Sequence, residues 1–336
     1  MGKRSILFWL ITAYVAFITL WLILRVLFFD RFWPLALLNT VAEFLFLPLP
    51  VFLLLGLGRR NWAGLLALTI PAAAFVVLFG ELFLPRFAMP AEGNDEPLIT
   101  VMSFNVLYTN ADFGAVARSI RAASPDLVGM QELSSTGAGA IAATLEDEYP
   151  YSTLKPLEPG RGAGLLSRFP IETVEPFSLP PLNIALHATV NMEGRRLHVF
   201  VVHLSANNFL DRPVAEYGPL AIERYGRRAA EAVRLREEIA GLDEPVVLMC
   251  DCNLTDTSEA YNRLRGFMND SFREAGWGVR HTLYIPVVPF PVQRLDYVWH
   301  SDKFAAVDAF VGQAGGSDHL PAVAKLRLVK APRSLE

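Results

Sequence analysis

Polar side chains of a few types recur in this 336-residue chain at the points where apolar runs end. The runs LITVMSFN, DLVGMQE and VVLMCDCN close on an amide or a carboxylate, and RLHVFVVH closes on an imidazole. Polar groups at the ends of apolar strands converge on one edge of a sheet, where α/β proteins place ligands. The candidates are Asn105, Glu132, His203, Asp251, Asn253, Asp296, Asp318 and His319. Oxygen ligands and histidines, without a nucleophilic serine motif, favour metal-assisted chemistry.

Both cysteines of the chain flank one of these candidates, in the stretch LMCDCN. Cys250 and Cys252 alone cannot build a Cys₄ or Cys₂His₂ zinc site. Neighbours at that spacing on a strand point to the same face, with Asp251 on the opposite one. A disulfide that closes so short a loop would be strained. We therefore expect Cys250 and Cys252 to be two small buried or half-buried thiols.

Strand-like and helix-like segments alternate after the first quarter of the chain. Strands are predicted at 98–106, 126–133, 185–192, 196–204, 245–253, 294–301 and 322–329, several of them apolar enough to be buried on both faces. Helical spacing marks 112–123 and 220–242. Strands with intervening helices and some direct connections predict a sheet-containing core with helices packed outside.

Three long apolar stretches, at about 6–24, 34–57 and 62–84, precede this region. Each has about 20 residues, enough for a helix to span a hydrocarbon core of about 30 Å. A cleaved signal peptide is the alternative for the first stretch, but its apolar part is too long and two more stretches follow. The predicted organisation is a membrane anchor of three transmembrane helices at 1–86, a linker at 87–97, a catalytic domain at 98–329 and a tail at 330–336.

Basic residues beside the spans predict their orientation. The positive-inside rule places basic ends in the cytoplasm. Arg25 and Arg31 on the opposite loop weaken this assignment. An odd number of spans then carries residues 90–336 to the outer side, extracytoplasmic in a bacterium or lumenal in a eukaryote; we expect a bacterial inner (plasma) membrane protein. The ends predicted to be cytoplasmic carry Lys3, Arg4, Arg59 and Arg60.

Two polar residues lie inside the second apolar stretch. Asn39 and Glu43 are one helical turn apart, and a carboxylate that faces lipid would be costly. We expect both to face the interior of a three-helix bundle and to help hold it together. A transport or sensing role is the alternative, but a single acid without a basic partner makes a poor relay. The anchor is accordingly predicted to serve only as an anchor.

The motifs that carry the candidate residues resemble those of the endonuclease/exonuclease/phosphatase superfamily. SFNVL, MQEL, VVHL, CDCN, RLDYVWHS and SDHLPAVAKL occur in the same order along the chain and cover residues 98–329. GAGLLSRFPI is similar to the segment that usually precedes the central histidine of that superfamily. Cys250 stands where the superfamily usually has glycine. The resemblance implies a four-layered α/β sandwich of two packed mixed β-sheets flanked by helices, and metal-dependent phosphoester hydrolysis.

The resemblance also implies a role for each candidate. Glu132 and Asn105 would hold Mg²⁺, with Mn²⁺ as a substitute, and Asp318 would assist. Asp251 would orient or deprotonate the attacking water, and Asn253 would donate its amide to the phosphate. His319, held by Asp296, would contact the phosphoryl group, and His203 would donate to the same oxygens. The histidines expected to be structural are His187, His198, His281 and His300.

Charge narrows the substrate class. From Ala91 onward the chain has 23 Lys and Arg residues against 31 Asp and Glu residues, whereas a non-specific nucleic-acid binder needs a basic surface. A compact substrate or a lipid headgroup is therefore favoured over long DNA. A local basic patch near the site stays an alternative. For the three arginines of 224–228, a solvated helix face is favoured over such a patch. The members of the patch would be Arg161, Arg224, Arg227, Arg228 and Arg294.

Two segments could shape the substrate site. Residues 205–226 form a long connection between the His203 strand and the long helix, and long loops beside a site usually shape it. Residues 287–292, VVPFPV, could form the opposite rim.

We expect a membrane-anchored, Mg²⁺-dependent phosphoesterase that acts outside the cytoplasm on a lipid headgroup or a small phosphodiester. An extracytoplasmic nuclease is the alternative within the same chemistry. A catalytically silent receptor or scaffold is the alternative of another class, and it is disfavoured because the expected polar residues are all present. The expected partners are a phosphoester substrate, either a lipid headgroup or a nucleic acid, and the lipid bilayer; no segment indicates a protein partner.

Overall fold

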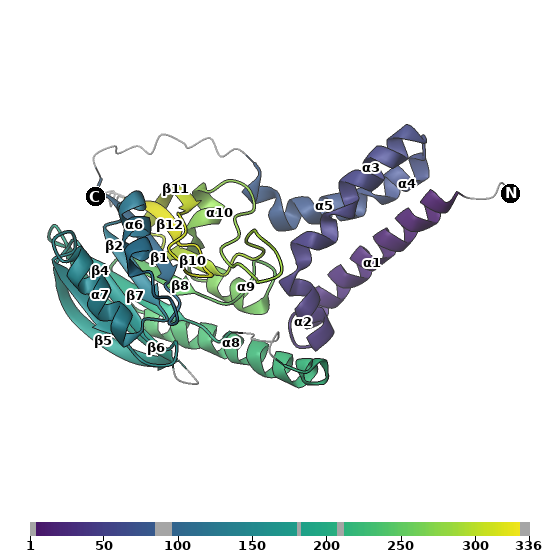
Figure 1. Cartoon of the computed structure of the whole chain (residues 1–336). Helices are drawn as coiled ribbons and strands as arrows, with labels where there is room; N and C mark the ends of the chain where they lie inside the picture. The colour runs from purple at the N-terminus through teal and green to yellow at the C-terminus, as the bar shows by residue number, and fades with distance from the viewer. Residues whose placement is uncertain (1–4, 85–95, 180–182, 207–211, 330–336) are drawn as a thin grey trace.

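The computed structural model describes residues 5–84, 96–179, 183–206 and 212–329. The predicted tail at 330–336, most of the predicted linker at 87–97, and Lys3 and Arg4 lie outside these ranges. The described chain has two parts, an α/β sandwich and a lobe of apolar helices that extends from it (Figure 1).

Two mixed sheets of six strands form the sandwich. The first sheet has the order β11-β12-β1-β2-β4-β3 and the second has the order β5-β6-β7-β8-β10-β9. The first sheet consists of β1 (Leu98–Asn105), β2 (Leu127–Gln131), β3 (Tyr151–Lys155), β4 (Ala163–Ser167), β11 (Phe304–Val311) and β12 (Ala322–Leu328). The second consists of β5 (Ile171–Leu179), β6 (Asn183–Met192), β7 (Arg195–His203), β8 (Val246–Asp251), β9 (Asn269–Asp270) and β10 (Asp296–His300).

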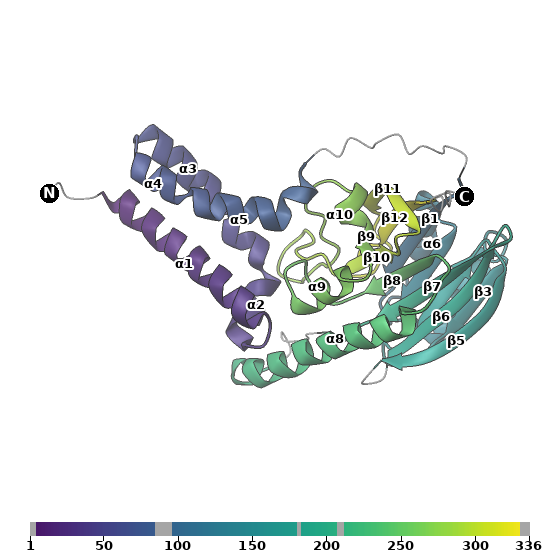
Figure 2. The same cartoon turned by 180° about the vertical axis from the view of Figure 1, so that it is seen from behind.

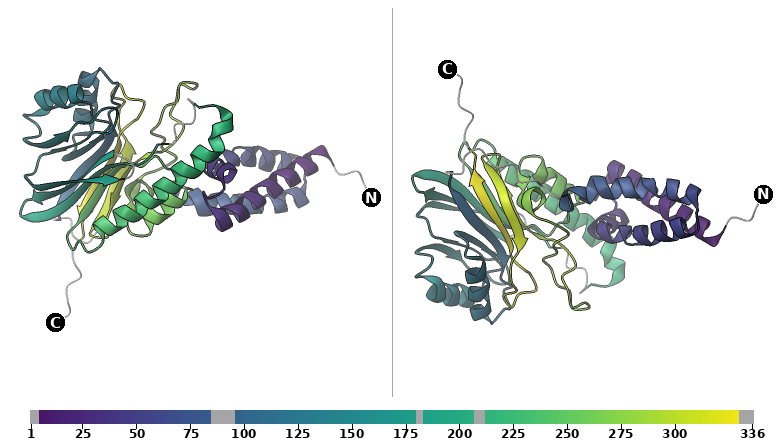
Figure 3. Two further views of the ribbon diagram at one scale, coloured as in Figure 1. Left: turned by 90° about the horizontal axis from the view of Figure 1, so that it is seen from below. Right: turned by 90° about the horizontal axis from the view of Figure 1, so that it is seen from above.

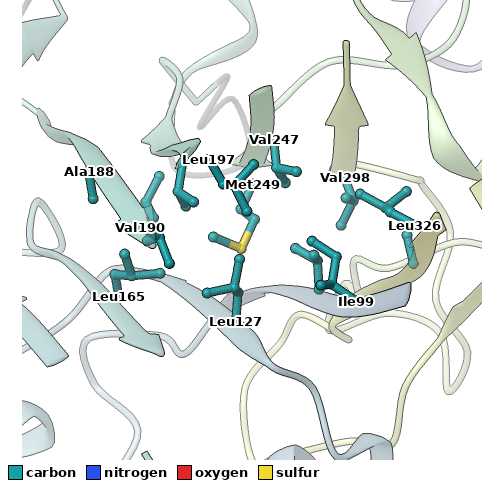
Figure 4. Packing of buried hydrophobic residues seen from close by; sticks show 14 of the residues in the cluster. Ile99, Leu127, Leu165, Ala188, Val190, Leu197, Val247, Met249, Val298 and Leu326 are labelled. Carbon is teal, nitrogen blue, oxygen red and sulfur yellow. The ribbon is translucent and has the colours of Figure 1, made fainter. Parts of the chain in front are cut away.

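Apolar side chains from both sheets fill the space between them (Figure 4). Met249 of β8 reaches across to the first sheet, where Gly129 of β2 lies opposite. A Cβ atom at Gly129 would lie 2.8 Å from the Cβ atom of Met249, so the close approach of β2 and β8 needs a glycine here. The central strands that carry the candidate residues are thereby held face to face.

Helices cover the outer faces of both sheets. On the first sheet, α6 (Phe113–Ala123) and α7 (Ser135–Leu145) pack their apolar residues against β1, β2 and β4. On the second sheet, α8 (Tyr217–Ile239), which follows the short η3 (Val214–Glu216), and α9 (Glu259–Arg265) pack against β7, β8 and β10. The short helix α10 (Ser271–Ala275) contributes Phe272 and Ala275 to the central core. The predicted four-layered sandwich is confirmed.

The apolar lobe contains two helical segments long and apolar enough to cross a membrane, Ile6–Phe28 and Trp62–Leu82. The first is α1, and the second comprises α4 (Trp62–Ala67), α5 (Thr69–Phe79) and η2 (Gly80–Leu82). The stretch between them is broken, because α2 (Trp33–Thr40) is bent by 76° from the residues Ala42–Gly58. Counting this bent pair as one span gives three.

The break divides the predicted second helix into α2, η1 (Ala42–Phe46) and α3 (Pro48–Gly58). The bend lies at Val41, whose backbone (φ −114°, ψ 21°) leaves the helical region between α2 and η1, whereas Leu47 before Pro48 keeps a helical backbone. Buried Asn39 stabilises the end of α2, since it accepts a hydrogen bond from Trp21 Nε1 (3.0 Å) and donates to Asp30 Oδ1 (2.8 Å).

The lobe is joined to the sandwich by buried polar contacts. Arg25, in the last turn of α1, donates to the Thr257 carbonyl (3.2 Å), and Asp30 accepts the Glu259 N–H (2.6 Å). Arg273 of α10 donates to the Leu78 carbonyl (2.7 Å). Figure 2 shows that α8 begins beside α2 and runs along the second sheet, and Figure 3 shows the lobe extending from this same side.

Glu43 does not lie within a helical bundle, so that expectation is wrong. Its carboxylate pairs with His281 of the sandwich, because the break after α2 turns η1 toward the loop that precedes β10. His281 Nδ1 also donates a hydrogen bond to the Pro291 carbonyl (3.0 Å). The acid predicted to lack a basic partner therefore has one.

Candidate active site

Three candidate residues form one row across the second sheet. The strands β7 and β8 are parallel and pair His203 with Asp251, and the antiparallel strand β10 pairs Asp296 with Asp251. Residues in one row of neighbouring strands point to the same face. His203 Nε2 lies 3.4 Å from Asp251 Oδ2, and all three side chains are buried.

The first sheet contributes Asn105 and Glu132. The parallel strands β1 and β2 pair Asn105 with Gln131, so Glu132 follows directly beside Asn105. Asn105 Nδ2 donates to Glu132 Oε1 (3.1 Å) and to Asp251 Oδ2 (2.8 Å), which links the two sheets at the site. The Asn105 Oδ1 atom accepts the Leu107 N–H (2.9 Å). The arrangement therefore turns the amide nitrogen toward the carboxylates, whereas the expected metal contact of Asn105 would need its oxygen there.

His319 and Asp296 form a buried pair. His319 Nδ1 lies 2.7 Å from Asp296 Oδ2, and His319 Nε2 lies 3.9 Å from Asp251 Oδ2. Burial alone would lower the pKa of His319, but the negative charges of Asp296 and Asp251 raise it to about 10. The imidazole is therefore protonated at neutral pH and can donate from Nε2. Ser317 fixes this loop, because its hydroxyl donates to the Asn105 carbonyl (2.8 Å) and accepts the His319 N–H (3.0 Å).

Asn253 and Asp318 complete the set. The Asn253 N–H donates to Asp251 Oδ1 (3.2 Å), and its side-chain amide donates to the Leu204 carbonyl (3.1 Å). Asp318 is exposed and lines the same cavity as Glu132, His203 and Asp251. The candidate residues thus all lie at one edge of the sandwich.

The backbone at this edge adopts uncommon conformations. Glu132 has φ 55° and Asn253 has φ 49°. Positive φ is uncommon for residues other than glycine, and such conformations cluster at functional sites because the surrounding structure must hold them. At both positions the chain turns out of a strand directly beside Asp251.

The donor set fits a hard divalent cation. One carboxylate or imidazole atom from each of Glu132, His203 and Asp251 lies within 4.8 Å of the others, and the same holds for Asp251, Asp296 and His319. Carboxylate oxygens are the ligands that Mg²⁺ prefers. The buried Nδ1 of His203 has no hydrogen-bond partner among the described residues, so its ring is free to present Nε2 toward the carboxylates.

A cavity of about 590 Å³ opens onto these residues. The sandwich supplies Tyr225 and Arg228 of α8 and the segments Tyr284–Pro286 and Val292–Gln293. The apolar lobe supplies Thr40, Val41 and Phe44. The bend between α2 and η1 places part of the lobe in the wall of this cavity, which an anchor alone would not require. Polar residues within the apolar stretch, Asn39 and Glu43, flank the bend and were the sequence signal for it.

The segments expected to shape the site border the cavity only in part. From the connection 205–226, Ala206 and Tyr225 line it, and residues 207–211 lie outside the described ranges. From the predicted rim 287–292, Val292 lines it.

Of the arginines proposed for a local basic patch, Arg228 lines the cavity and Arg294 does not. Arg294 is buried in ion pairs with Asp256 and Asp270. Arg228 is buried rather than on a solvated helix face, and it donates to the Ser205 carbonyl (3.0 Å).

The cysteines differ from the expectation, because Cys250 and Cys252 form a disulfide. In an extended strand, residues two apart would be about 6.6 Å apart, but β8 ends at Asp251 and the chain turns, which brings the two Cα atoms to 5.0 Å. Both side chains lie in the apolar layer beneath α8 and α9, on the face opposite Asp251.

Comparisons with known proteins agree with this architecture. A model of the Endonuclease/Exonuclease/phosphatase family matches residues 102–319. No curated protein matches the sequence. An endonuclease/exonuclease/phosphatase from Bacteroides vulgatus has a similar structure, with a TM-score of 0.58 and 20% identity over 70% of this chain and 100% of that chain.

Two further solved structures are similar. An endonuclease/exonuclease/phosphatase from Beutenbergia cavernae has a TM-score of 0.56 and 22% identity over 70% of this chain and 73% of that chain. A mannosyl-6-phosphatase from Bacteroides thetaiotaomicron has a TM-score of 0.51 and 16% identity over 68% of this chain and 99% of that chain. At these identities the likeness is one of fold.

Proposed function

Because this chain belongs to the endonuclease/exonuclease/phosphatase family of metal-dependent phosphoester hydrolases, we propose that it hydrolyses a lipid headgroup phosphoester, or another small phosphodiester, outside the cytoplasm. The observation that carries this proposal is the composition of the cavity. Its floor holds Asp251, His203 and Glu132, and one wall comes from the apolar lobe through Thr40, Val41 and Phe44. A phosphoester at a bilayer surface would lie beside that wall.

The metal site would use the carboxylates at the cavity floor. Glu132 is the main ligand in this proposal, with Asp318 beside the same cavity and Asn105 contributing if its amide oxygen faces the ion. Mg²⁺, or Mn²⁺ in its place, would supply charge neutralisation at the phosphoryl oxygens. The hard oxygen donors support these ions over a soft metal.

The other side chains would handle the water and the phosphoryl group. Asp251 is positioned by the Asn105 amide and the Asn253 N–H, and it would orient the attacking water and accept its proton. Protonated His319, oriented by Asp296, would donate to a phosphoryl oxygen. His203 and the Asn253 amide would donate to the same oxygens, which places donors where negative charge develops.

A substrate panel tests this proposal against the nuclease alternative. The full-length protein in detergent micelles or vesicles is assayed with Mg²⁺ against phospholipids, inositol phosphates, and single- and double-stranded DNA and RNA. We expect phospholipid or small phosphodiester turnover to exceed nucleic-acid turnover. Efficient degradation of DNA or RNA, with no lipid product, would show that the protein is a nuclease rather than a lipid hydrolase.

The proposed organisation is an anchor at 1–86, a linker at 87–97, a catalytic domain at 98–329 and a tail at 330–336. We propose that the catalytic domain lies on the extracytoplasmic side of a bacterial inner membrane. Arg59 and Arg60 support this orientation because they join α3 to α4, and the joined ends of these helices lie away from the sandwich (Figure 1), on the side that the positive-inside rule assigns to the cytoplasm.

A pair of reporter fusions after residue 336 tests the orientation. A reporter that is active only in the cytoplasm should be silent, and one that is active only outside the cytoplasm should give a signal. Both fusions are compared at equal protein abundance. The reverse pattern would place the catalytic domain inside the cell and permit a cytoplasmic substrate.

A further inference from the structure

We propose that the bent segment between α2 and α3 is a substrate subsite that binds the apolar part of a lipid phosphoester, beside the catalytic residues. This inference rests on the proposed lipid hydrolase function and names the substrate class more closely, as a lipid that keeps its acyl chains at the bilayer while its phosphoester reaches Asp251. Val41 and Phe44 would be the specificity-determining residues.

The bend exposes apolar side chains to the catalytic cavity. Val41 and Phe44 are 37% and 36% exposed, and both line the cavity that contains Asp251 and His319. In a continuous helix through residues 34–57, these side chains would face neighbouring helices or lipid. The cavity is therefore polar where it meets the carboxylates and apolar where it meets the lobe, which matches an amphiphile better than a free headgroup.

Contacts on both sides fix this segment to the sandwich. Thr40 Oγ1 is hydrogen-bonded to the Tyr225 hydroxyl of α8, and the Thr40 carbonyl accepts a hydrogen bond from Gln293 Nε2 (3.4 Å). Glu43 pairs with His281, whose ring also packs 6.0 Å from the Phe44 ring. Phe44 is consequently held at a fixed place in the wall, as a binding residue must be.

The position of the bend along the lobe suits a bilayer surface. Arg25, in the last turn of α1, contacts the sandwich through Thr257, and α2 follows at the same end of the lobe (Figure 1). From there α3 runs away from the sandwich. If the lobe spans a bilayer, Phe44 therefore lies near the surface that faces the catalytic residues.

Exposed apolar side chains on the sandwich extend this surface. Val287 and Phe290 of the loop before β10 are 81% and 56% exposed, and the same loop lines the cavity through Ile285 and Val292. Exposed apolar groups next to a cavity indicate a lipid or ligand contact when they adjoin a membrane-spanning part. Together they favour bilayer lipid over a soluble ligand as the occupant.

The test compares a phospholipid in mixed micelles with the deacylated form of the same headgroup phosphodiester. For the full-length Phe44→Asn variant, we expect kcat/KM for the phospholipid to fall by about tenfold or more, because an apolar contact is lost. We expect kcat/KM for the deacylated phosphodiester to stay within about twofold of the wild type. Val41→Asn should show the same selective loss and serves as a second variant if Phe44→Asn folds poorly.

The matched control is Leu54→Asn, since Leu54 is 71% exposed on α3 and does not line the cavity. It makes the same change from an apolar side chain to an amide and should leave both substrates unaffected. Equal losses for both substrates in the two cavity variants, or no loss for either, would overturn the subsite. If the wild-type protein hydrolyses only the deacylated phosphodiester, both the subsite and the lipid hydrolase function are wrong. If the wild-type protein hydrolyses the phospholipid but the two cavity variants show no selective loss, only the subsite is wrong.

Discussion

The Asp251→Asn variant should lose nearly all hydrolysis, by a factor of about 10² to 10⁴ or more, because an amide of the same shape cannot take a proton from water. Asp251 lies at the centre of the site, in contact with Asn105, Asn253 and His203. The loss should appear in kcat at saturating Mg²⁺ and substrate, with the variant protein still folded by circular dichroism.

The cysteines that flank Asp251 provide the matched control. The double variant with Cys250→Gly and Cys252→Ala breaks the disulfide and removes two small side chains from the apolar layer beneath α8 and α9. It costs stability but leaves the charges of the site in place, so turnover should fall far less than in Asp251→Asn. If the double-cysteine variant folds but is as inactive as Asp251→Asn, the cysteines are essential for catalysis and the assignment to Asp251 is wrong.

The Glu132→Gln variant should remain folded and should lose activity at ordinary Mg²⁺ concentrations. Glu132 is the partly exposed carboxylate of the cluster, and Mg²⁺ binding depends on such charged oxygens. An excess of Mg²⁺ should restore part of the turnover, so the measurement is a Mg²⁺ titration of activity. Unchanged turnover in the variant, or full wild-type activity in the presence of a chelator, would contradict the assignment of Glu132 as a Mg²⁺ ligand.

Glu146→Gln is the control for this change, because Glu146 is an exposed acid at the end of α7 and does not line the catalytic cavity. It removes the same single charge from the protein. Its Mg²⁺ titration should coincide with that of the wild type, so a parallel shift in both variants would indicate a general electrostatic effect rather than a ligand.

The strands that carry the candidate residues were predictable because they are short apolar runs buried on both faces. The segments 98–106, 126–133 and 245–253 correspond to β1, β2 and β8. Polar residues at the ends of such strands stand out, and strand ends converge in a sheet. Sequence therefore indicated which side chains would meet, although the register that sets His203, Asp251 and Asp296 in one row required the structure.

The edges of the sheets were not predicted, and neither was α7. β3 and β5 are edge strands with mostly exposed or half-buried residues, so they lack a clear apolar run. The helix α7, STGAGAIAATL, is rich in alanine and glycine and carries little helical periodicity in its apolar residues. Each of these elements is fixed by its neighbours rather than by its own pattern.

The contribution of the apolar lobe could not be derived from hydropathy. A sliding count of apolar residues treats 34–57 as one span, and it does not show that the chain bends after Thr40. The contacts of Thr40 with Tyr225 and of Glu43 with His281 join residues far apart in sequence. Only the folded arrangement places Val41 and Phe44 beside the catalytic carboxylates.

Hydrolysis in ¹⁸O-enriched water tests the central claim most directly, namely that a water molecule attacks phosphorus in a Mg²⁺-dependent reaction. The full-length protein is supplied with Mg²⁺ and its best phosphoester substrate, and both products are analysed by mass spectrometry. We predict one heavy oxygen in the phosphate-containing product for each turnover, none in the alcohol, and no turnover in a chelator. Heavy oxygen in the alcohol, or equal product formation without a divalent cation, would contradict the account.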